Sequence, residues 1–195
     1  MLLDDKFIRG MTNNSKLTIP ELLRNSVENF AENNSLIYVD LDGAESILGI
    51  EIPTYVTLNK GRKGNIIGTC KCTAEQFPLL VETYNRHYQL YNQYRSGNYP
   101  PEKGAIAKTS CTSGGPENGH ASILWLEPSC WECIDACVLA HELVHADQCH
   151  RLGVVLYQGR TKQELEPPAF AVSLNCLWDW LKVFEKEYNE SIRRK

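Results

Sequence analysis

The chain has 195 residues, of which 43% are hydrophobic and 23% are charged, and its formal net charge is −4. The negative charge argues against nucleic-acid binding, and we interpret the short basic cluster Lys60, Arg62 and Lys63 as a hairpin tip rather than an anion site. No apolar run approaches the roughly 20 residues that a membrane span needs. The segment MLLDDKFIRG has acidic residues and no apolar core, so we expect no signal peptide.

Local patterns predict helices and strands that intermingle along the chain. In chain order they are a capped helix that starts at Thr18-Ile-Pro20-Glu21, a strand over 35–41, a hairpin of 55–58 and 65–69, a helix from the capping box Thr73–Gln76 to about Tyr94, strands over 105–109 and 121–126, a helix over 133–150, a short connection over 152–159, and a last helix from about 168 to 188. Because no βαβ unit repeats, we predict the α+β class.

Eight cysteines are many for a chain of this size. They are Cys70, Cys72, Cys111, Cys130, Cys133, Cys137, Cys149 and Cys176. Their number is compatible with buried free thiols or with two or three disulfides formed in an oxidising compartment. Cys130 and Cys133 have the spacing of half a zinc knuckle, but no second half follows, so a structural zinc cluster is the weakest of the three alternatives.

The segment LAHELVHADQ, residues 139–148, carries two histidines four positions apart. On a helix, His141 and His145 are separated by about 40° and project from one face, where two imidazoles can bind one zinc ion. Glu142 follows the first histidine and is placed to act as the general base that takes a proton from zinc-bound water.

The same segment is apolar on nearly every side, which predicts a buried helix. Two histidines and a glutamate are costly to bury unless they are hydrogen-bonded or bind a metal. The alternative is that core hydrogen bonds satisfy the histidines, but that alternative has to account for three polar groups on one turn. The pattern therefore favours a Zn²⁺ site held by His141 and His145.

A catalytic zinc ion usually has three protein ligands, so a third is expected. The metzincin pattern is excluded, because Gln148 and Arg151 stand where it requires glycine and histidine. Two glutamates follow at a suitable distance. Glu166 continues the apolar stripe of the last helix, whereas Glu164 forms a capping box with Thr161. We expect Glu166 to be the ligand, with Glu164 as the alternative.

Two prolines directly follow Glu166, and they argue against a helical position for this residue. Pro167 and Pro168 disfavour helical geometry at the residues before them, which would put Glu166 at the mouth of the last helix, outside its regular phase.

The sequence His141-Glu142-Leu143-Val144-His145 followed by Glu166-Pro-Pro-Ala169 resembles the HExxH…ExxA signature of gluzincin-type metallopeptidases, over roughly residues 120–185. The resemblance implies one zincin-like domain over 1–195, with an N-terminal part (1–103) and a catalytic part (104–195). It implies a small mixed sheet packed on the active-site helix, a C-terminal helix that bears the glutamate ligand, and peptide hydrolysis. It also implies that the strand Ala121–Leu126 is the sheet edge along which a peptide pairs.

Further roles remain open at the level of the sequence. The side chain that stabilises the oxyanion could be Tyr157, Arg160 or His120, and Asp147 or Gln148 could orient a metal ligand. The chain also resembles metallopeptidase domains of bacterial secreted effectors and polymorphic toxins. That resemblance implies a dedicated secretion route, an oxidising compartment such as the periplasm, a protein or peptide substrate and a cognate inhibitor or immunity protein.

Three other readings compete with the effector interpretation. They are a cytoplasmic peptidase, a non-catalytic zincin-like domain that binds a protein partner, and a binding domain stabilised by disulfides alone.

Overall fold

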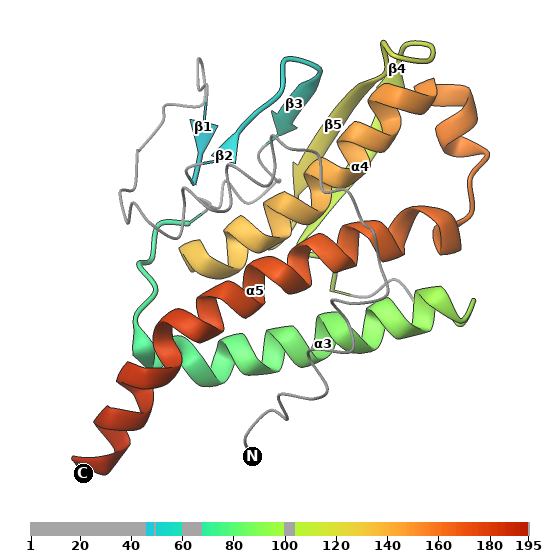
Figure 1. Cartoon of the computed structure of the whole chain (residues 1–195). Coiled ribbons are helices and arrows are strands. Elements are labelled where there is room, and N and C mark those ends of the chain that lie inside the picture. Colours follow the sequence, from blue (N-terminus) through green and yellow to red (C-terminus); the bar gives the residue numbers. More distant parts are fainter. Residues whose placement is uncertain (1–45, 49, 60–67, 100–103, 195) are drawn as a thin grey trace.

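The computed structural model describes residues 46–48, 50–59, 68–99 and 104–194, and these form a mixed α+β fold (Figure 1). The elements are β1 (Ser46–Ile47), β2 (Ile50–Glu51), β3 (Val56–Asn59), the 3₁₀ turn η1 (Ala74–Gln76), α3 (Phe77–Arg95), β4 (Ala107–Ser113), β5 (His120–Trp125), α4 (Glu132–Gln158) and α5 (Lys162–Arg193). The helix expected after Thr18, the strand expected over 35–41, the basic cluster and positions 65–67 of the hairpin lie outside the described residues. No helix in the described ranges is long and apolar enough to cross a membrane.

The main sheet has the strand order β3–β5–β4, with β5 parallel to β3 and antiparallel to β4. Alternate residues of β5, namely Ala121, Ile123 and Trp125, are buried. Since β5 is paired on both sides, our expectation that it forms the sheet edge is wrong. Strand order depends on long-range pairing, and the local pattern of residues 121–126 does not encode it. Within the described residues β4 is an edge strand.

Helix α4 lies between the sheet on one side and α5 on the other, and α3 packs against α5 (Figure 1). The predicted burial of α4 is confirmed, because residues 132–146 are all buried. The capping box of Thr73 and Gln76 is present and leads into α3, as predicted. Tyr84 and Tyr94 of α3 are buried, and they lie on the part of the helix that packs against its neighbours.

A break at Gly153 divides α4 into two pieces. Gly153 has φ 73° and ψ 165°, and its Cα lies so close to the backbone of Gly115 that a Cβ there would clash. The loop between β4 and β5 supplies hydrogen bonds to the interrupted helix, since Gly119 N–H donates to the carbonyl of His150 and Glu117 N–H to that of Arg151. Where we predicted a connection over 152–159, the helix therefore resumes in a new direction.

Helix α5 begins at Lys162, earlier than the predicted start near residue 168. Thr161 and Glu164 form the predicted capping box, with Thr161 N–H donating to Glu164 Oε2 at 2.8 Å. Pro167 and Pro168 lie inside the helix and remove two backbone donors. The carbonyls that lose these donors belong to residues 163 and 164, which are exposed and can bond water. Glu166 therefore lies within the helix.

All eight cysteines form disulfides: Cys70–Cys130, Cys72–Cys133, Cys111–Cys149 and Cys137–Cys176, with Cα–Cα distances of 5.2, 5.9, 5.4 and 5.4 Å. Disulfide formation is thus confirmed, with more bridges than the two or three expected, and the free-thiol and zinc-cluster alternatives are wrong. The pairing brings together cysteines far apart in sequence, which no local pattern indicates.

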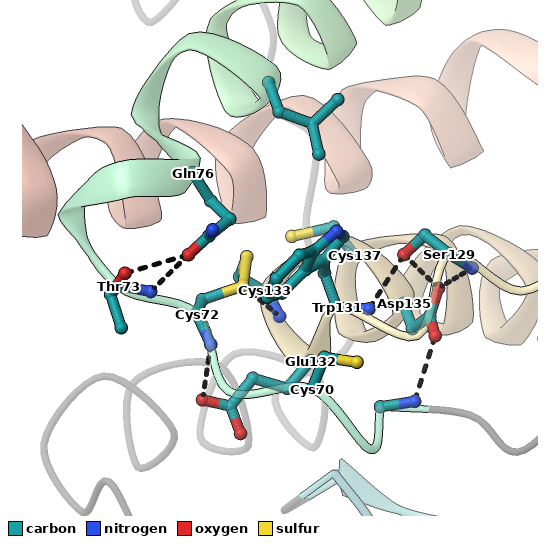
Figure 2. The surroundings of a disulfide bond; sticks show 12 residues. Cys70, Cys72, Thr73, Gln76, Ser129, Trp131, Glu132, Cys133, Asp135 and Cys137 are labelled. Carbon is teal, nitrogen blue, oxygen red and sulfur yellow. Dashed lines mark hydrogen bonds between the residues drawn. A yellow bond between two sulfur atoms is a disulfide. The ribbon is translucent and has the colours of Figure 1, made fainter.

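The first two bridges join the segment before η1 to the start of α4, and Figure 2 shows the surroundings of the Cys72–Cys133 bridge. Beside them, the fully buried Asp135 accepts hydrogen bonds from Ser129 N–H, from the Ser129 hydroxyl and from Gly68 N–H, at 2.9, 2.7 and 3.0 Å. These bonds offset the cost of burying a carboxylate and fix the start of the helix that carries the histidines.

Candidate metal centre

Three side-chain atoms from α4 and α5 converge at one point. His141 Nε2 and His145 Nε2 are 3.2 Å apart, and Glu166 Oε2 lies 3.6 and 3.5 Å from them. A point equidistant from atoms at these separations can lie about 2.0 Å from each, which is close to the zinc–nitrogen and zinc–oxygen bond length. Both histidines are buried and the Glu166 side chain is 21% exposed, so the triangle opens toward solvent on the carboxylate side.

Gln148 sets the tautomer of His145. Its amide nitrogen donates to the carbonyl of Leu165 at 3.0 Å, which turns Oε1 toward His145 Nδ1, 2.9 Å away. Because Oε1 can only accept, His145 Nδ1 carries the proton, and its Nε2 presents a lone pair to the centre. Of the two residues that we considered for this role, Gln148 fills it, whereas Asp147 forms an ion pair with Arg151 at 2.6 Å.

The ring of His141 is held by packing. It lies edge-on against Phe170, with the ring centroids 4.5 Å apart, and its Nδ1 is buried with no hydrogen-bond partner among the described residues. Phe170 also packs edge-on against the buried His87, whose pKa is lowered to about 3 by burial and by the neighbouring His141. An apolar wall on α5 therefore directs His141 toward the other two ligand atoms.

The charges at the centre favour a cation between these groups. Burial alone would lower the pKa of His145, but hydrogen bonding to Glu166 and the charge of Glu166 outweigh it and raise that pKa. Burial would likewise raise the pKa of Glu166, yet hydrogen bonds with His141 and His145 hold it well below its usual value. The carboxylate thus remains ionised beside two imidazoles, a donor set of the kind that binds zinc.

The alternative ligand, Glu164, is not part of the cluster. Its carboxylate accepts from Thr161 N–H and from Arg160 at 2.7 Å, which lowers its pKa to about 2. Its side chain is 47% exposed and points away from α4's histidines into its own helix cap.

Glu142 is buried and its charge acts on His145, but its carboxylate is not one of the three convergent groups and belongs to a separate interaction. The hydroxyl of Thr109, on β4, lies 2.6 Å from Glu142 Oε2 and 3.1 Å from the Glu142 carbonyl oxygen. Thr109 is the residue that sequence reasoning missed. Its only local signal is an inward position on a strand, and its partner is 33 positions away.

The three candidates for oxyanion stabilisation occupy different environments. Tyr157, on the last turn of α4, has a raised pKa because of burial and the negative charges of Glu166 and Glu142. Arg160 pairs with Glu164 at the surface, and the side chain of His120 is exposed on β5. Tyr94 of α3 is also buried near Glu166, whose charge contributes to its raised pKa.

Comparison with models of known protein families, with characterised proteins and with solved structures gives no match for this chain. The interpretation of the centre therefore depends on its own geometry. The separations of the three atoms, one of which belongs to an imidazole with a fixed tautomer, fit a zinc ion at their centre.

Proposed function

We propose that this protein is a zinc-dependent hydrolase that cleaves peptide bonds. The observation that carries the proposal is the triangle of His141 Nε2, His145 Nε2 and Glu166 Oε2, whose 3.2–3.6 Å sides suit three ligands of one zinc ion. The carboxylate of Glu142 is separate from this triangle, yet its charge acts on His145, which favours a catalytic centre over a purely structural one.

In this proposal each residue has a distinct task. A bound zinc ion lowers the pKa of a water molecule and polarises a carbonyl. Glu142 accepts a proton from the attacking water through the carboxylate oxygen that Thr109 does not occupy, and later delivers it to the leaving amine. Thr109 fixes the orientation of that carboxylate. Tyr157, whose pKa is raised and which therefore keeps its proton, donates a hydrogen bond to the developing oxyanion.

The strand that suits an extended peptide is β4. It is an edge strand of the described sheet, and it carries Thr109, the partner of Glu142. A peptide that added to β4 would be recognised through its backbone and would run past the catalytic carboxylate. This assignment replaces the one made from sequence, which gave the role to β5.

The four disulfides favour a working location in an oxidising compartment such as the periplasm. We extend the proposal to an effector or toxin domain that reaches such a compartment through a dedicated secretion system and is held in check by a cognate inhibitor protein. The same bridges would also suit a non-catalytic binding domain, in which Glu142 would have no chemical task.

The test combines metal content with peptide cleavage. Protein purified without chelator should contain about one zinc per chain by elemental analysis. Glu166→Gln should lose the zinc, and the matched control Glu164→Gln should keep it. Glu142→Gln should keep zinc but fail to cleave a quenched peptide library that the wild type cleaves.

Zinc retained by Glu166→Gln would refute the ligand set. A wild type that binds zinc, cleaves no peptide and is indifferent to Glu142→Gln would support the non-catalytic binding domain instead.

A further inference from the structure

Two disulfides bracket the metal-binding histidines on α4. Cys137, His141, His145 and Cys149 follow one another at four-residue intervals, so neighbouring members of the series lie on adjacent turns of the helix. Each step of four advances about 40° around the axis, so the series turns gradually from one side of α4 to another. All four side chains are buried.

The bridges from the ends of this series reach the two elements that complete the site. Cys137 is bonded to Cys176 on α5, the helix that carries Glu166. At the other end, Cys149 is bonded to Cys111 on β4, two positions after Thr109 and therefore on the same face of that strand.

Cys149 also directly follows Gln148, which fixes the tautomer of His145. One end of the series is thus covalently joined to the helix that carries Glu166, and the other end to the strand that carries Thr109.

We propose that the disulfides Cys137–Cys176 and Cys111–Cys149 position the metal ligands, so that the affinity for zinc depends on the oxidation of these two bridges. The inference rests on the proposed zinc site. Reduction by a dithiol transfers two electrons and two protons to a bridge, breaks its Sγ–Sγ bond to give two thiols, and leaves the dithiol oxidised to its own disulfide. The released α5 and β4 can then move relative to α4, and the ligand triangle is no longer held.

The chain provides a matched control in Cys70–Cys130. Its residues are half-buried, it lies at the start of α4, and neighbouring Cys72–Cys133 still joins the same segments when it is removed (Figure 2). It closes a longer stretch of chain, with a separation of 60 residues against 38 and 39 for the two inner bridges. Because Cys72–Cys133 closes nearly the same stretch, the loss of Cys70–Cys130 alone should destabilise the fold only modestly in the chain-entropy model, and this variant tests the loss of a disulfide that is joined to neither α5 nor β4.

The first experiment compares zinc affinity and thermal stability in three variants, with Zn²⁺ added to metal-free protein in competition with a chromophoric chelator. These are Cys137→Ala/Cys176→Ala, Cys111→Ala/Cys149→Ala and the control Cys70→Ala/Cys130→Ala. We expect the two inner variants to bind zinc at least about tenfold more weakly, the range seen when supporting contacts of a metal site are lost. The control should keep its affinity.

The possible outcomes separate the two proposals. A wild type that binds no zinc would overturn the proposed function itself. Zinc affinity that is equal in the wild type and the inner variants, or that falls equally in all three variants, would overturn the positioning role of the two bridges and leave the zinc site standing.

A second experiment on the unaltered chain covers the case in which an inner variant fails to fold. Thermodynamic linkage is reciprocal: if an intact bridge raises the zinc affinity by some factor, bound zinc shifts the equilibrium between the reduced and the oxidised bridge toward the oxidised form by the same factor. In dithiol buffers of graded ratio, with mass-spectrometric mapping of thiols, added Zn²⁺ should make the two inner bridges harder to reduce and leave Cys70–Cys130 unchanged. Reduction of the inner bridges that is indifferent to zinc, or that zinc promotes, would overturn the proposal.

Discussion

Replacing Gln148 with leucine would remove the amide that joins His145 to the carbonyl of Leu165. Two hydrogen bonds of 2.9 and 3.0 Å are lost; His145 remains buried and the carbonyl of Leu165 partly buried. Each stranded partner costs about 1–3 kcal/mol, of which the apolar leucine side chain recovers a part, so we expect the metal-free protein to lose about 2–4 kcal/mol of unfolding free energy. Zinc affinity should fall about 10- to 100-fold, because His145 is no longer held in one tautomer.

Urea unfolding in the presence of chelator measures the first quantity, and competition with a chromophoric chelator measures the second. Gln148→Glu should recover zinc affinity, since a carboxylate still accepts from His145 Nδ1, but not the full stability, since it cannot donate to Leu165. Asp147→Asn, which breaks only the partly exposed ion pair with Arg151, should change neither by much. Wild-type zinc affinity in Gln148→Leu would refute the role that we assign to Gln148.

Three further perturbations probe other parts of the centre. Thr109→Val should lower kcat about tenfold or more with zinc affinity unchanged, because it frees only the Glu142 carboxylate; a parallel fall in affinity, measured by chelator competition, would contradict this. Gly153→Ala should lower the melting temperature by an amount corresponding to about 1–3 kcal/mol, since a side chain there meets both a positive φ and the facing loop; an unchanged melting temperature would show that the break relaxes freely. Because the pKa of His145 is raised by folding, its protonation adds stability below pH 6.5, and this stability is lost as the pH rises through the pKa of the folded state. The pKa of Glu166 is lowered by folding, so its ionisation adds stability that is lost as the pH falls below 4.5. Metal-free protein should therefore unfold at lower urea near pH 8 than near pH 6, a difference that Glu166→Gln should remove.

The parts of the centre that could be predicted from sequence are those that one helix encodes. The i, i+4 spacing of His141 and His145 fixes their relation on α4, and the apolar run around them fixes the burial of that helix. Glu166 followed from the same kind of reasoning, because the stripe of α5 has a helical period that one more step extends to the carboxylate. The structure brings these three side chains together, although Pro167 and Pro168 suggested a later helix start.

The parts that could not be predicted depend on contacts between distant segments. Thr109 looks like any inward residue of a strand until β4 is placed against α4. The central position of β5 requires β3 to pair in parallel with it, across a separation that no local pattern records. The pairing of eight cysteines has the same character, since the eight residues allow 105 connectivities in principle.

The four bridges overlap along the chain, and this overlap has a consequence for proteolysis. Their spans, 70–130, 72–133, 111–149 and 137–176, leave no peptide bond between residues 70 and 176 that at least one bridge does not straddle. A single cut anywhere in that interval, the exposed β4–β5 loop included, would give two fragments that stay covalently joined. A protease can thus nick the protein in this interval and leave His141, His145, Glu166 and the edge strand β4 in one covalent molecule.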